Sequence, residues 1–346
     1  MRILMLTTDK VNPYDNLAKE EYLMGLCRSQ TRRDESRIYD AILFLWQNDN
    51  TVVIGRNQNA WAEARTELLE SEGGHLARRG TGGGAVFHDL GNLNFSLILP
   101  QQDFHLDRTF EFILQLVQSL GIEAERSGRN DILVGGRKFS GNAFRQLAGV
   151  GLHHGTLLID SDYGRVGRYL TVSSEKLKSK AVESVRSRIT NLKAVKEDLT
   201  IAEVIRKALE LFPAFFGPDS AVDILDDRSF PADERLQALE ARYASWEWRY
   251  GKTFAFGSNL AHRFDWGQID LQLHVENGIV TEAMLYSDAL DSDFISQQPN
   301  RLKGLSFSSK AMADALENDV DDEINYGVSR RKMAADIAGL IRDEGW

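Results

Sequence analysis

The chain has almost no cysteine and no long hydrophobic run. Cys27 is the single cysteine in 346 residues, which excludes an internal disulfide framework and favours a reducing compartment, the cytoplasm. No apolar run approaches the roughly 18 residues of a membrane-spanning helix, and the opening MRILMLTTDK is too short and too polar for a secretory signal peptide. These absences predict a soluble cytoplasmic protein with no membrane partner.

An excess of positive charge is also missing. The formal net charge is −10 at pH 7, which argues against broad binding to nucleic acid or to anionic membranes. An anionic ligand would therefore have to be met by local cations. With 42% hydrophobic and 27% charged residues, the chain has the composition of a globular protein, and its length favours two domains.

Strand and helix patterns alternate along the chain without a repeat or a low-complexity segment. Strands are expected at MRILML, AILFLW, TVVIGR, NDILV, GRKFSGNAFRQ and HHGTLLI. Helices are expected at NLAKEEYLMGLC, with Asn16 as its cap, at DRTFEFILQLVQSLG, and at AEVIRKALELF and DERLQALEARYASW. This order predicts an α+β fold.

The composition changes near residue 251. The alternating residues Ile269, Leu271, Leu273 and Val275 lead through Glu276-Asn277-Gly278 into a second strand, which is typical of a β-hairpin. A helical face of Met333, Ile337, Leu340 and Ile341 follows near the end of the sequence. We therefore expect one domain at 1–250 and a small α+β domain at 251–346.

A glycine-rich stretch, RRGTGGGAVFHDLGN at residues 78–92, carries the first functional signal. Gly80, Gly82 and Ala85 satisfy a relaxed dinucleotide fingerprint, but no helix follows, as that motif requires. Three successive glycines are also a costly way to build a plain hairpin, because glycine loses the most conformational entropy on folding. A strand-to-strand loop that admits a ligand close to the backbone is the favoured interpretation.

Three further segments carry weaker signals. GRKFSGNAF places Lys138 after a Gly-Gly turn at a strand start, although alone it could be a surface cation, and it lacks the glycine spacing of a P-loop. His153 and His154 are adjacent on a strand and must point to opposite faces, which argues against joint metal ligation; one of them is expected to line a pocket or to form local hydrogen bonds. Arg186 and Arg188 lie in a loop-like stretch, residues 184–192.

Taken together, these segments resemble the lipoate-protein ligase A family. RRGTGGGAVFHDLGN is similar to the family signature RRxSGGGxVxHDxGN, and GRKFSGNAF to its RKxSGxA lysine motif. HHGTLL, SVRSRITNL, NLAKEE, TVVIGRNQN, SGRND and SWEW correspond to further family segments in the same order. The resemblance implies a biotin/lipoate-ligase-like mixed-sheet domain at 1–250 that binds lipoate and ATP, and a small accessory domain at 251–346.

The resemblance also implies a reaction and its residues. Lipoate would be activated to lipoyl-AMP with release of pyrophosphate, and Lys138 would be the catalytic residue that bridges the lipoyl carboxylate and the α-phosphate. The residues implied to bind ATP and lipoyl-AMP are Arg79, Gly82, Gly83, Gly84, Ala85, Val86, Phe87, Asp131, Lys138 and His154, with Arg78 as a possible second cation. Arg186 and Arg188 would lie in a lid over the adenylate. Mg²⁺ is expected with ATP, and Asp131, or more weakly Asp89, is the candidate ligand.

The implied acceptors are apo lipoyl domains of 2-oxoacid dehydrogenase E2 subunits and of the glycine cleavage H protein. Two alternatives stay open at this point, and a third is disfavoured. An octanoyltransferase would need a nucleophilic cysteine, and Cys27 lies in the NLAKEEYLMGLC helix, away from the glycine stretch. A transferase could accept only preformed lipoyl-AMP, and a non-catalytic protein could bind lipoate without turnover.

Overall fold

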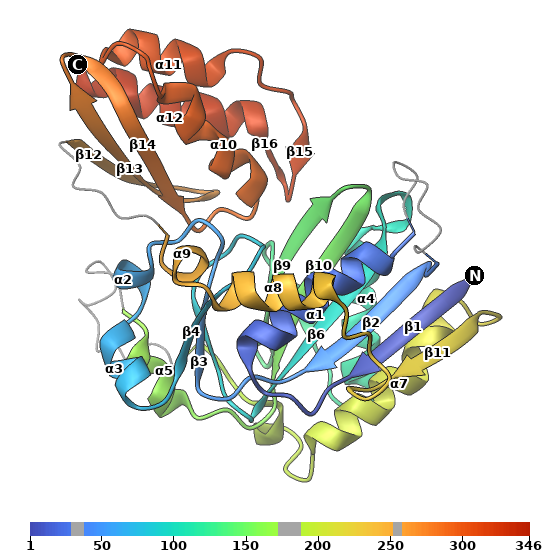
Figure 1. Cartoon of the computed structure of the whole chain (residues 1–346). Helices are drawn as coiled ribbons and strands as arrows, with labels where there is room; N and C mark the ends of the chain where they lie inside the picture. Colours follow the sequence, from blue (N-terminus) through green and yellow to red (C-terminus); the bar gives the residue numbers. More distant parts are fainter. Residues whose placement is uncertain (29–37, 172–187, 252–257) are drawn as a thin grey trace. The chain divides into compact units, whose positions relative to one another are not determined.

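The computed structural model describes four stretches of the chain (Figure 1), which are residues 1–28, 38–171, 188–251 and 258–346. The chain divides into two compact units. Unit 1 consists of Met1–Val53, Glu63–Arg78 and Ala85–Arg249. Unit 2 consists of Ile54–Ala62, Arg79–Gly84 and Tyr250–Trp346. Two short pieces of the N-terminal part of the chain therefore belong to the same unit as the C-terminal part.

An eight-stranded mixed sheet, in the order β11-β1-β2-β6-β10-β9-β8-β7, is the centre of unit 1. Its strands are β1 (Arg2–Thr7), β2 (Ala41–Trp46), β6 (Asn92–Pro100), β7 (Glu125–Ser127), β8 (Asp131–Val134), β9 (Arg137–Leu147), β10 (Val150–Leu158) and β11 (Ala221–Leu225). β1 pairs in parallel with β11 and β2, and the pairs from β2 to β7 are antiparallel. β2 and β6 are buried along their whole length, as central strands with apolar runs are. The predicted α+β class is confirmed.

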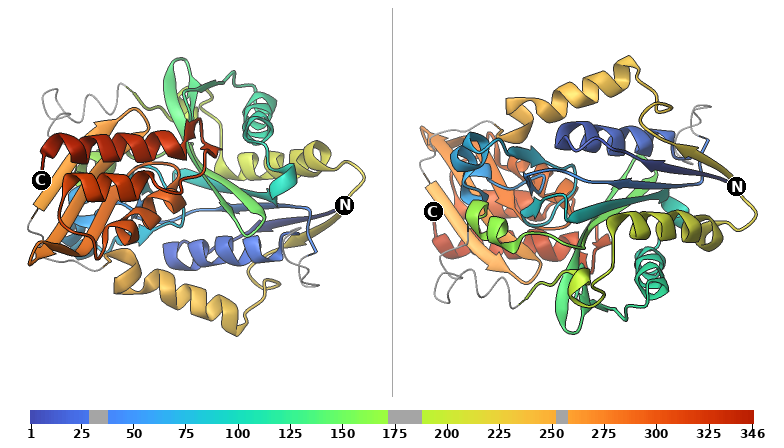
Figure 2. Two further views of the ribbon diagram at one scale, coloured as in Figure 1. Left: turned by 90° about the horizontal axis from the view of Figure 1, so that it is seen from above. Right: turned by 90° about the horizontal axis from the view of Figure 1, so that it is seen from below.

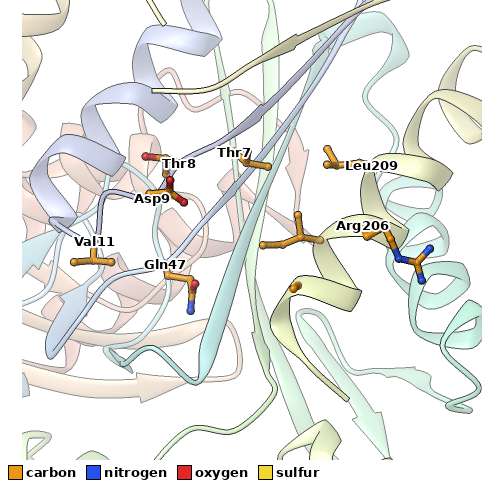
Figure 3. A pocket seen from close by; sticks show the side chains of 9 residues that line it. Thr7, Thr8, Asp9, Val11, Gln47, Arg206 and Leu209 are labelled. Atoms are coloured by element: carbon orange, nitrogen blue, oxygen red, sulfur yellow. The ribbon is translucent and has the colours of Figure 1, made fainter. Parts of the chain in front are cut away.

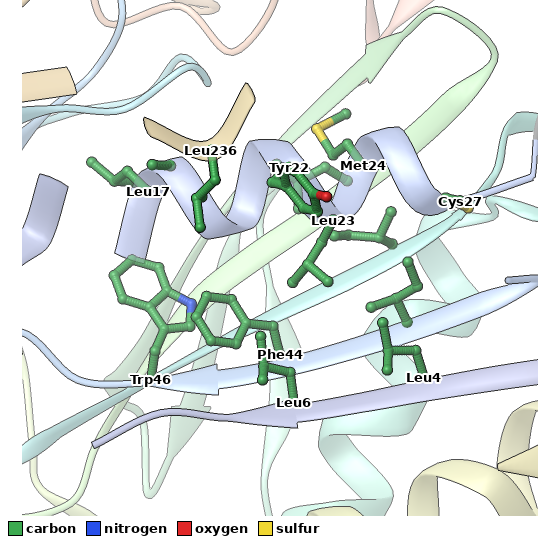
Figure 4. Packing of buried hydrophobic residues seen from close by; sticks show 14 of the residues in the cluster. Leu4, Leu6, Leu17, Tyr22, Leu23, Met24, Cys27, Phe44, Trp46 and Leu236 are labelled. Carbon is green, nitrogen blue, oxygen red and sulfur yellow. The ribbon is translucent and has the colours of Figure 1, made fainter. Parts of the chain in front are cut away.

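Helices cover both faces of this sheet (Figure 2). α1 (Pro13–Leu26) and α8 (Glu234–Ala244) lie on one face, and α4 (Leu106–Ser119) and α7 (Ile201–Phe216) on the other. On the first face, Leu17 and Leu23 of α1 belong to one buried cluster with Phe44 and Trp46 of β2 (Figure 4). Each such side chain stabilises the fold by about 1.5–3 kcal/mol relative to leaving it in water. The apolar stripes of the helices therefore fix the sheet on which the site is built.

The first helix begins at a different residue from the predicted cap. Asn12 caps α1, since its side chain accepts from the Tyr14 N–H at 2.9 Å, and Pro13 follows in the first helical position. Asn16 lies inside the helix, fully buried, and its amide donates to the carbonyls of Lys10 and Gln47 at 3.0 and 2.9 Å. The predicted role of Asn16 was wrong because tertiary contacts claim its side chain.

Smaller elements complete unit 1. They are β3 (Thr51–Ile54), β4 (His75–Arg78), β5 (Val86–His88), α2 (Ala60–Glu63), α3 (Thr66–Ser71), α5 (Tyr163–Tyr169), α9 (Trp246–Arg249) and the 3-10 turns η1 (Gln101–Asp103) and η2 (Leu192–Ala194), with the last residue of β3 and most of α2 assigned to unit 2. β3 lies between β4 and β5 in a second, three-stranded sheet.

In the parts of the chain that the structure describes, none of the helices is both long and apolar enough to cross a membrane.

Unit 2 contains an antiparallel three-stranded sheet packed against helices. Its elements are β12 (Ser258–Phe264), β13 (Gly267–Glu276), β14 (Ile279–Ser287), α10 (Ser292–Leu302), α11 (Ser309–Glu317), α12 (Arg330–Glu344) and the short pair β15 (Ile324–Asn325) and β16 (Val328–Ser329). Asn277 and Gly278, with φ of 51° and 76°, form the predicted turn between β13 and β14. Ile269 and Leu273 of this hairpin and Ile337 of α12 lie in its core. The predicted hairpin and final helix are both confirmed.

Candidate active site

The lysine motif forms a hairpin with a two-residue turn. Gly135 and Gly136, with φ of 55° and 73°, connect β8 to β9, because this turn requires left-handed backbone at both positions. The pairing is irregular next to Leu133, which lies opposite Lys138. The Lys138 ammonium is 2.7 Å from the Asp131 carboxylate, and about a third of each side chain is exposed. The predicted residues Lys138 and Asp131 are thus brought together at a partly open position.

A glycine beside the lysine makes room for its ammonium group. A Cβ atom on Gly141 would lie 3.0 Å from both Cε and Nζ of Lys138. The Gly141 N–H donates to Oγ1 of Thr156 on β10 at 3.1 Å. The lysine side chain therefore lies across Gly141, next to Thr156. Gly141 belongs to the lysine motif GRKFSGNAF, whereas Thr156 was not predicted for the site, since only the pairing of β9 with β10 brings it to the lysine.

The backbone of Lys138 is also paired on its other side. The Lys138 N–H donates to the Arg188 carbonyl at 2.8 Å, and the Thr190 N–H donates to the Lys138 carbonyl at 2.8 Å. Ile189 forms a parallel bridge with the lysine between these bonds. The predicted Arg188 is exposed and belongs to the chain next to the lysine. Arg186 lies outside the described residues.

The adjacent histidines point to opposite faces of β10, as predicted. His153 is fully buried and is held by Thr109 Oγ1 at 2.7 Å and by Asn142 Oδ1 at 2.8 Å. Burial lowers the pKa of His153 well below its ordinary value, because the charged form loses its hydration. His153 is therefore a neutral core residue at physiological pH.

His154 belongs to a buried polar chain on the face covered by α1. Its Nδ1 lies 2.8 Å from Oε1 of Glu20, and the Ser96 hydroxyl donates to the same oxygen at 2.5 Å. The Trp46 indole N–H donates to the Ser96 oxygen at 3.0 Å. Glu20, Ser96 and Trp46 were not predicted, because 134 residues separate Glu20 from His154 and only the fold brings them together.

The glycine loop is organised by the predicted Arg79. Arg79 and the glycines of the loop lie within Arg79–Gly84, a segment that belongs to unit 2. Arg79 is only 7% exposed, and its guanidinium donates to the carbonyls of Gly82 and Gly84 at 2.7 and 2.8 Å and to the Thr81 hydroxyl at 3.0 Å. This cation holds the loop in shape from within; its predicted contact with the nucleotide stays a prediction.

The three glycines of the loop have three different environments. A Cβ atom on Gly82 would lie 2.1 Å from the Ala289 carbonyl oxygen, so the backbones there are too close for a side chain. Gly83 has a φ of 92°, which side chains rarely tolerate. Gly84 is exposed, and a Cβ atom there would meet nothing within 4 Å. Packing and conformation account for Gly82 and Gly83, which leaves Gly84 as the position where a ligand could approach.

Arg78 connects β4 to the SWEW segment within unit 1. Its Nε and Nη2 donate to the carbonyls of Trp248 and Arg249, each at 2.9 Å, and the Trp248 indole donates back to the Arg78 carbonyl at 2.8 Å. Arg78 is 7% exposed. These contacts give it a structural task, which the sequence pattern did not indicate.

The predicted Ala85, Val86 and Phe87 follow the loop into β5 of unit 1. Phe87 is 6% exposed; its ring centre lies 5.5 Å from that of Tyr169, and the Arg165 guanidinium lies 5.6 Å from it. Tyr169 and Arg165 come from α5, which therefore covers β5. The Tyr169 hydroxyl donates to Glu72 at 2.6 Å, so α5 is in turn tied to the end of α3.

This tie predicts a loss of stability in acid. Hydrogen bonds from Arg168 and Tyr169 lower the pKa of Glu72 to about 2, from an ordinary 4.5. A carboxyl with a depressed folded pKa contributes its full stability above the unfolded pKa, and the contribution disappears as the pH falls from about 4.5 to about 2. We expect Glu72→Gln to have a lower free energy of unfolding than the wild type in urea at pH 6. The difference in free energy between the two proteins should become smaller below pH 4.5. A gap that does not change with pH would contradict the role of Glu72.

Asp89 is engaged by the backbone. Its two carboxylate oxygens accept from the Gly91 and Asp162 N–H groups at 2.9 and 2.8 Å. Among the described residues, no group of three or more histidine, cysteine or acidic side chains could hold a metal ion. Asp131 is the better candidate for a single magnesium ligand, because Mg²⁺ that arrives with a nucleotide needs only one or two protein carboxylates.

Cys27 is fully buried at the end of α1, where its Sγ is 3.8 Å from the Arg28 carbonyl.

A cavity of about 500 Å³ is found elsewhere in unit 1, between the ends of β1 and β2 and helix α7 (Figure 3). Its lining residues are Thr7, Thr8, Asp9, Val11, Gln47, Ala202, Ile205, Arg206 and Leu209. None of the residues predicted for the site lines this cavity.

Comparison with protein families identifies the chain. Residues 12–213 match the family described as the lipoyl protein ligase A/B catalytic domain, and residues 253–337 match the bacterial lipoate protein ligase C-terminus. The chain belongs to the lipoate-protein ligase family. The predicted resemblance is confirmed, and the lysine hairpin of this ligase lies within the matched catalytic region.

Individual related proteins support the same family assignment. The lipoate-protein ligase A of Psychrobacter cryohalolentis is 37% identical over 324 residues, covering 91% of this ligase and 93% of that protein. The structure of P. falciparum LipL1 in complex with lipoate has a TM-score of 0.83 at 26% identity, over 99% of this chain and 100% of that one. A lipoate-protein ligase A bound with ATP has a TM-score of 0.57 at 26% identity, over 72% of this chain and 98% of that one.

Proposed function

We propose that this protein activates lipoate to lipoyl-AMP and then transfers the lipoyl group to a lysine of an apo lipoyl domain. The observation that carries the proposal is the Lys138 ammonium, held across Gly141 and 2.7 Å from Asp131 at a partly exposed position. A fixed cation is what a reaction between two anions requires. Lipoate and ATP are the molecules present in the two related structures.

In the first step a carboxylate oxygen of lipoate attacks the α-phosphorus of ATP. A C–O–P bond forms, the bond to the β-phosphate breaks, and pyrophosphate leaves with the electron pair. Lys138 offsets the repulsion between the carboxylate and the phosphate, and its charge is most effective as the transition state forms. It acts as an electrostatic clamp and forms no covalent bond. Asp131 is the residue that would hold Mg²⁺, and the ion would supply further neutralisation of phosphate charge.

In the second step the ε-amine of the acceptor lysine attacks the carbonyl carbon of lipoyl-AMP. The amide bond forms, AMP leaves, and the amine loses a proton. The lipoyl chain is apolar and needs a slot. We place it on the α1 face of the sheet, along the residues that run from Thr156 and His154 towards Trp46.

The remaining predicted residues complete the proposal. Arg79 and Gly82–Gly84 shape the loop that binds the nucleotide, with Ala85, Val86 and Phe87 next to it. Arg188, and Arg186 outside the described residues, protect the adenylate from water. Residues 1–250 form the catalytic domain and 251–346 the accessory domain of a cytoplasmic enzyme.

The proposed acceptors are apo lipoyl domains of 2-oxoacid dehydrogenase E2 subunits and the H protein. An archaeal relative from Thermoplasma acidophilum, a bipartite ligase, was studied with its E2 lipoyl domain; its structure has a TM-score of 0.60 at 26% identity and covers 74% of this chain and 98% of that one. This likeness supports a lipoyl domain as the partner.

Pyrophosphate release tests the two steps separately. We expect release from ATP with lipoate alone, followed by a mass increase of an apo lipoyl domain when it is added. Modification only from supplied lipoyl-AMP would mean that the first step is absent. Lipoate binding without either product would leave a non-catalytic binding protein.

A further inference from the structure

Two buried asparagines on β6 leave hydrogen-bonding atoms unused. Asn92 is fully buried and Asn94 is 2% exposed. The Asn92 Nδ2 donates to Oδ1 of Asn94 at 2.9 Å. Within the described parts of the chain, Nδ2 of Asn94 and Oδ1 of Asn92 have no partner. A buried amide without a partner costs about 1–3 kcal/mol, so such a group calls for an explanation.

Strand pairing places Asn94 in line with the lysine. Asn94 lies opposite Trp46 of β2 on one side and opposite Thr156 of β10 on the other. Directly opposed residues point to the same face, with Cβ atoms about 4.5–5.5 Å apart. Thr156 in turn holds Gly141, over which the Lys138 ammonium lies. One row across the sheet therefore contains Trp46, Asn94, Thr156 and the lysine.

The face of this row is the one that carries the polar chain of His154. Side chains alternate along β6, so Asn94 shares its face with Ser96, whose hydroxyl contacts Glu20 of α1. Asn94 is thus the buried donor between Trp46 and the charged, partly exposed end of the row at Lys138. A bound molecule that contacts Lys138 and extends along this row must pass over Asn94.

We propose that Asn94 is a substrate-binding residue whose Nδ2 donates a hydrogen bond to the acyl carboxyl group. This inference rests on the proposed function. The only strong hydrogen-bond acceptors of lipoate are its carboxylate oxygens, and Lys138 attracts the same group. Asn94 and Lys138 then hold the carboxylate from two directions. In the adenylate the same donor contacts the carbonyl oxygen, which gains negative charge when the acceptor amine attacks.

Two substitutions at one position test the donor. Asn94→Leu keeps the shape and removes the donor, so the Kd for lipoate in titration calorimetry should rise about tenfold, the effect of one hydrogen bond. Asn94→Asp should bind lipoate still more weakly at pH 7.5, because its carboxylate cannot donate a hydrogen bond and repels the carboxylate of lipoate. The Kd for ATP should stay within a factor of about two in both variants.

Asn142 on β9 offers a matched control. It is 5% exposed, its Nδ2 donates to the Asn130 carbonyl and the Ser140 hydroxyl at 3.1 and 3.2 Å, and its Oδ1 contacts His153. Asn142→Leu should therefore lower the melting temperature and leave the Kd for lipoate unchanged. If Asn94→Leu does not fold, Asn94→Ala serves in its place.

The outcomes separate this inference from the proposed function. A wild-type protein that neither binds lipoate nor releases pyrophosphate would overturn both. If the wild type is active and Asn94→Leu binds lipoate with an unchanged Kd, only the role of Asn94 is overturned. The Asn94 amide would then donate its hydrogen bond to water. Tighter binding in Asn94→Leu would show that the amide presents its oxygen, and would also overturn the role.

Discussion

Lys138→Ala should reduce lipoyl-AMP formation by at least about a hundred- to a thousandfold, the effect of removing one well-placed group that stabilises transition-state charge. In the proposed mechanism, the variant loses the ammonium that offsets the repulsion between the lipoate carboxylate and the α-phosphate. It should nevertheless fold, because the backbone bonds of Lys138 to Arg188 and Thr190 do not involve its side chain. Pyrophosphate release with lipoate and ATP is the measurement.

The Asp131 partner provides the control for this experiment. Asp131→Asn removes the carboxylate that lies 2.7 Å from the ammonium but leaves the cation in place. Because Asp131 is also the proposed Mg²⁺ ligand, we expect Asp131→Asn to need a higher Mg²⁺ concentration for half-maximal adenylation, whereas Lys138→Ala should lose adenylation at every Mg²⁺ concentration. Both variants should unfold at urea concentrations close to that of the wild type. A Lys138→Ala protein that keeps most of its adenylation rate would remove the clamp from the mechanism.

Local sequence patterns were sufficient for most elements of both units. The Gly-Gly turn before Lys138 and the Asn277-Gly278 turn need left-handed backbone, and these residue pairs supply it at low cost. Opposite orientation of His153 and His154 follows from the two-residue period of any strand. Such predictions succeed because each depends on residues that are close in the sequence.

The contacts around the lysine and around His154 could not be predicted in this way. Thr156 reaches Gly141 through strand register, and Glu20 reaches His154 across 134 residues of sequence. A shift of one residue in the register would turn Thr156 to the other face. The motif predicts a role for Lys138, but the pairing between strands decides which side chains lie beside it.

Gly82 shows the same limit, because the sequence pattern favoured a ligand as the reason for all three glycines. The structure gives Gly82 another reason: a Cβ atom would lie 2.1 Å from the Ala289 carbonyl oxygen and 2.8 Å from that of Leu290, both in unit 2. Backbone atoms cannot move aside cheaply. The glycine loop is thus held by chain packing at one glycine and is open at another.

A pair of alanine substitutions in the loop separates packing from ligand binding. Gly82→Ala should lower the free energy of unfolding by about 1–3 kcal/mol, the usual cost of overpacking, while Gly84→Ala should not, since a Cβ atom there meets nothing within 4 Å. Both glycines have negative φ or extended backbone, so the comparison isolates contact from conformation. If the nucleotide approaches Gly84, that variant should instead raise the KM for ATP in pyrophosphate release. Equal losses of stability in urea unfolding would mean that the loop responds as a whole, and an unchanged KM in Gly84→Ala would place the nucleotide elsewhere.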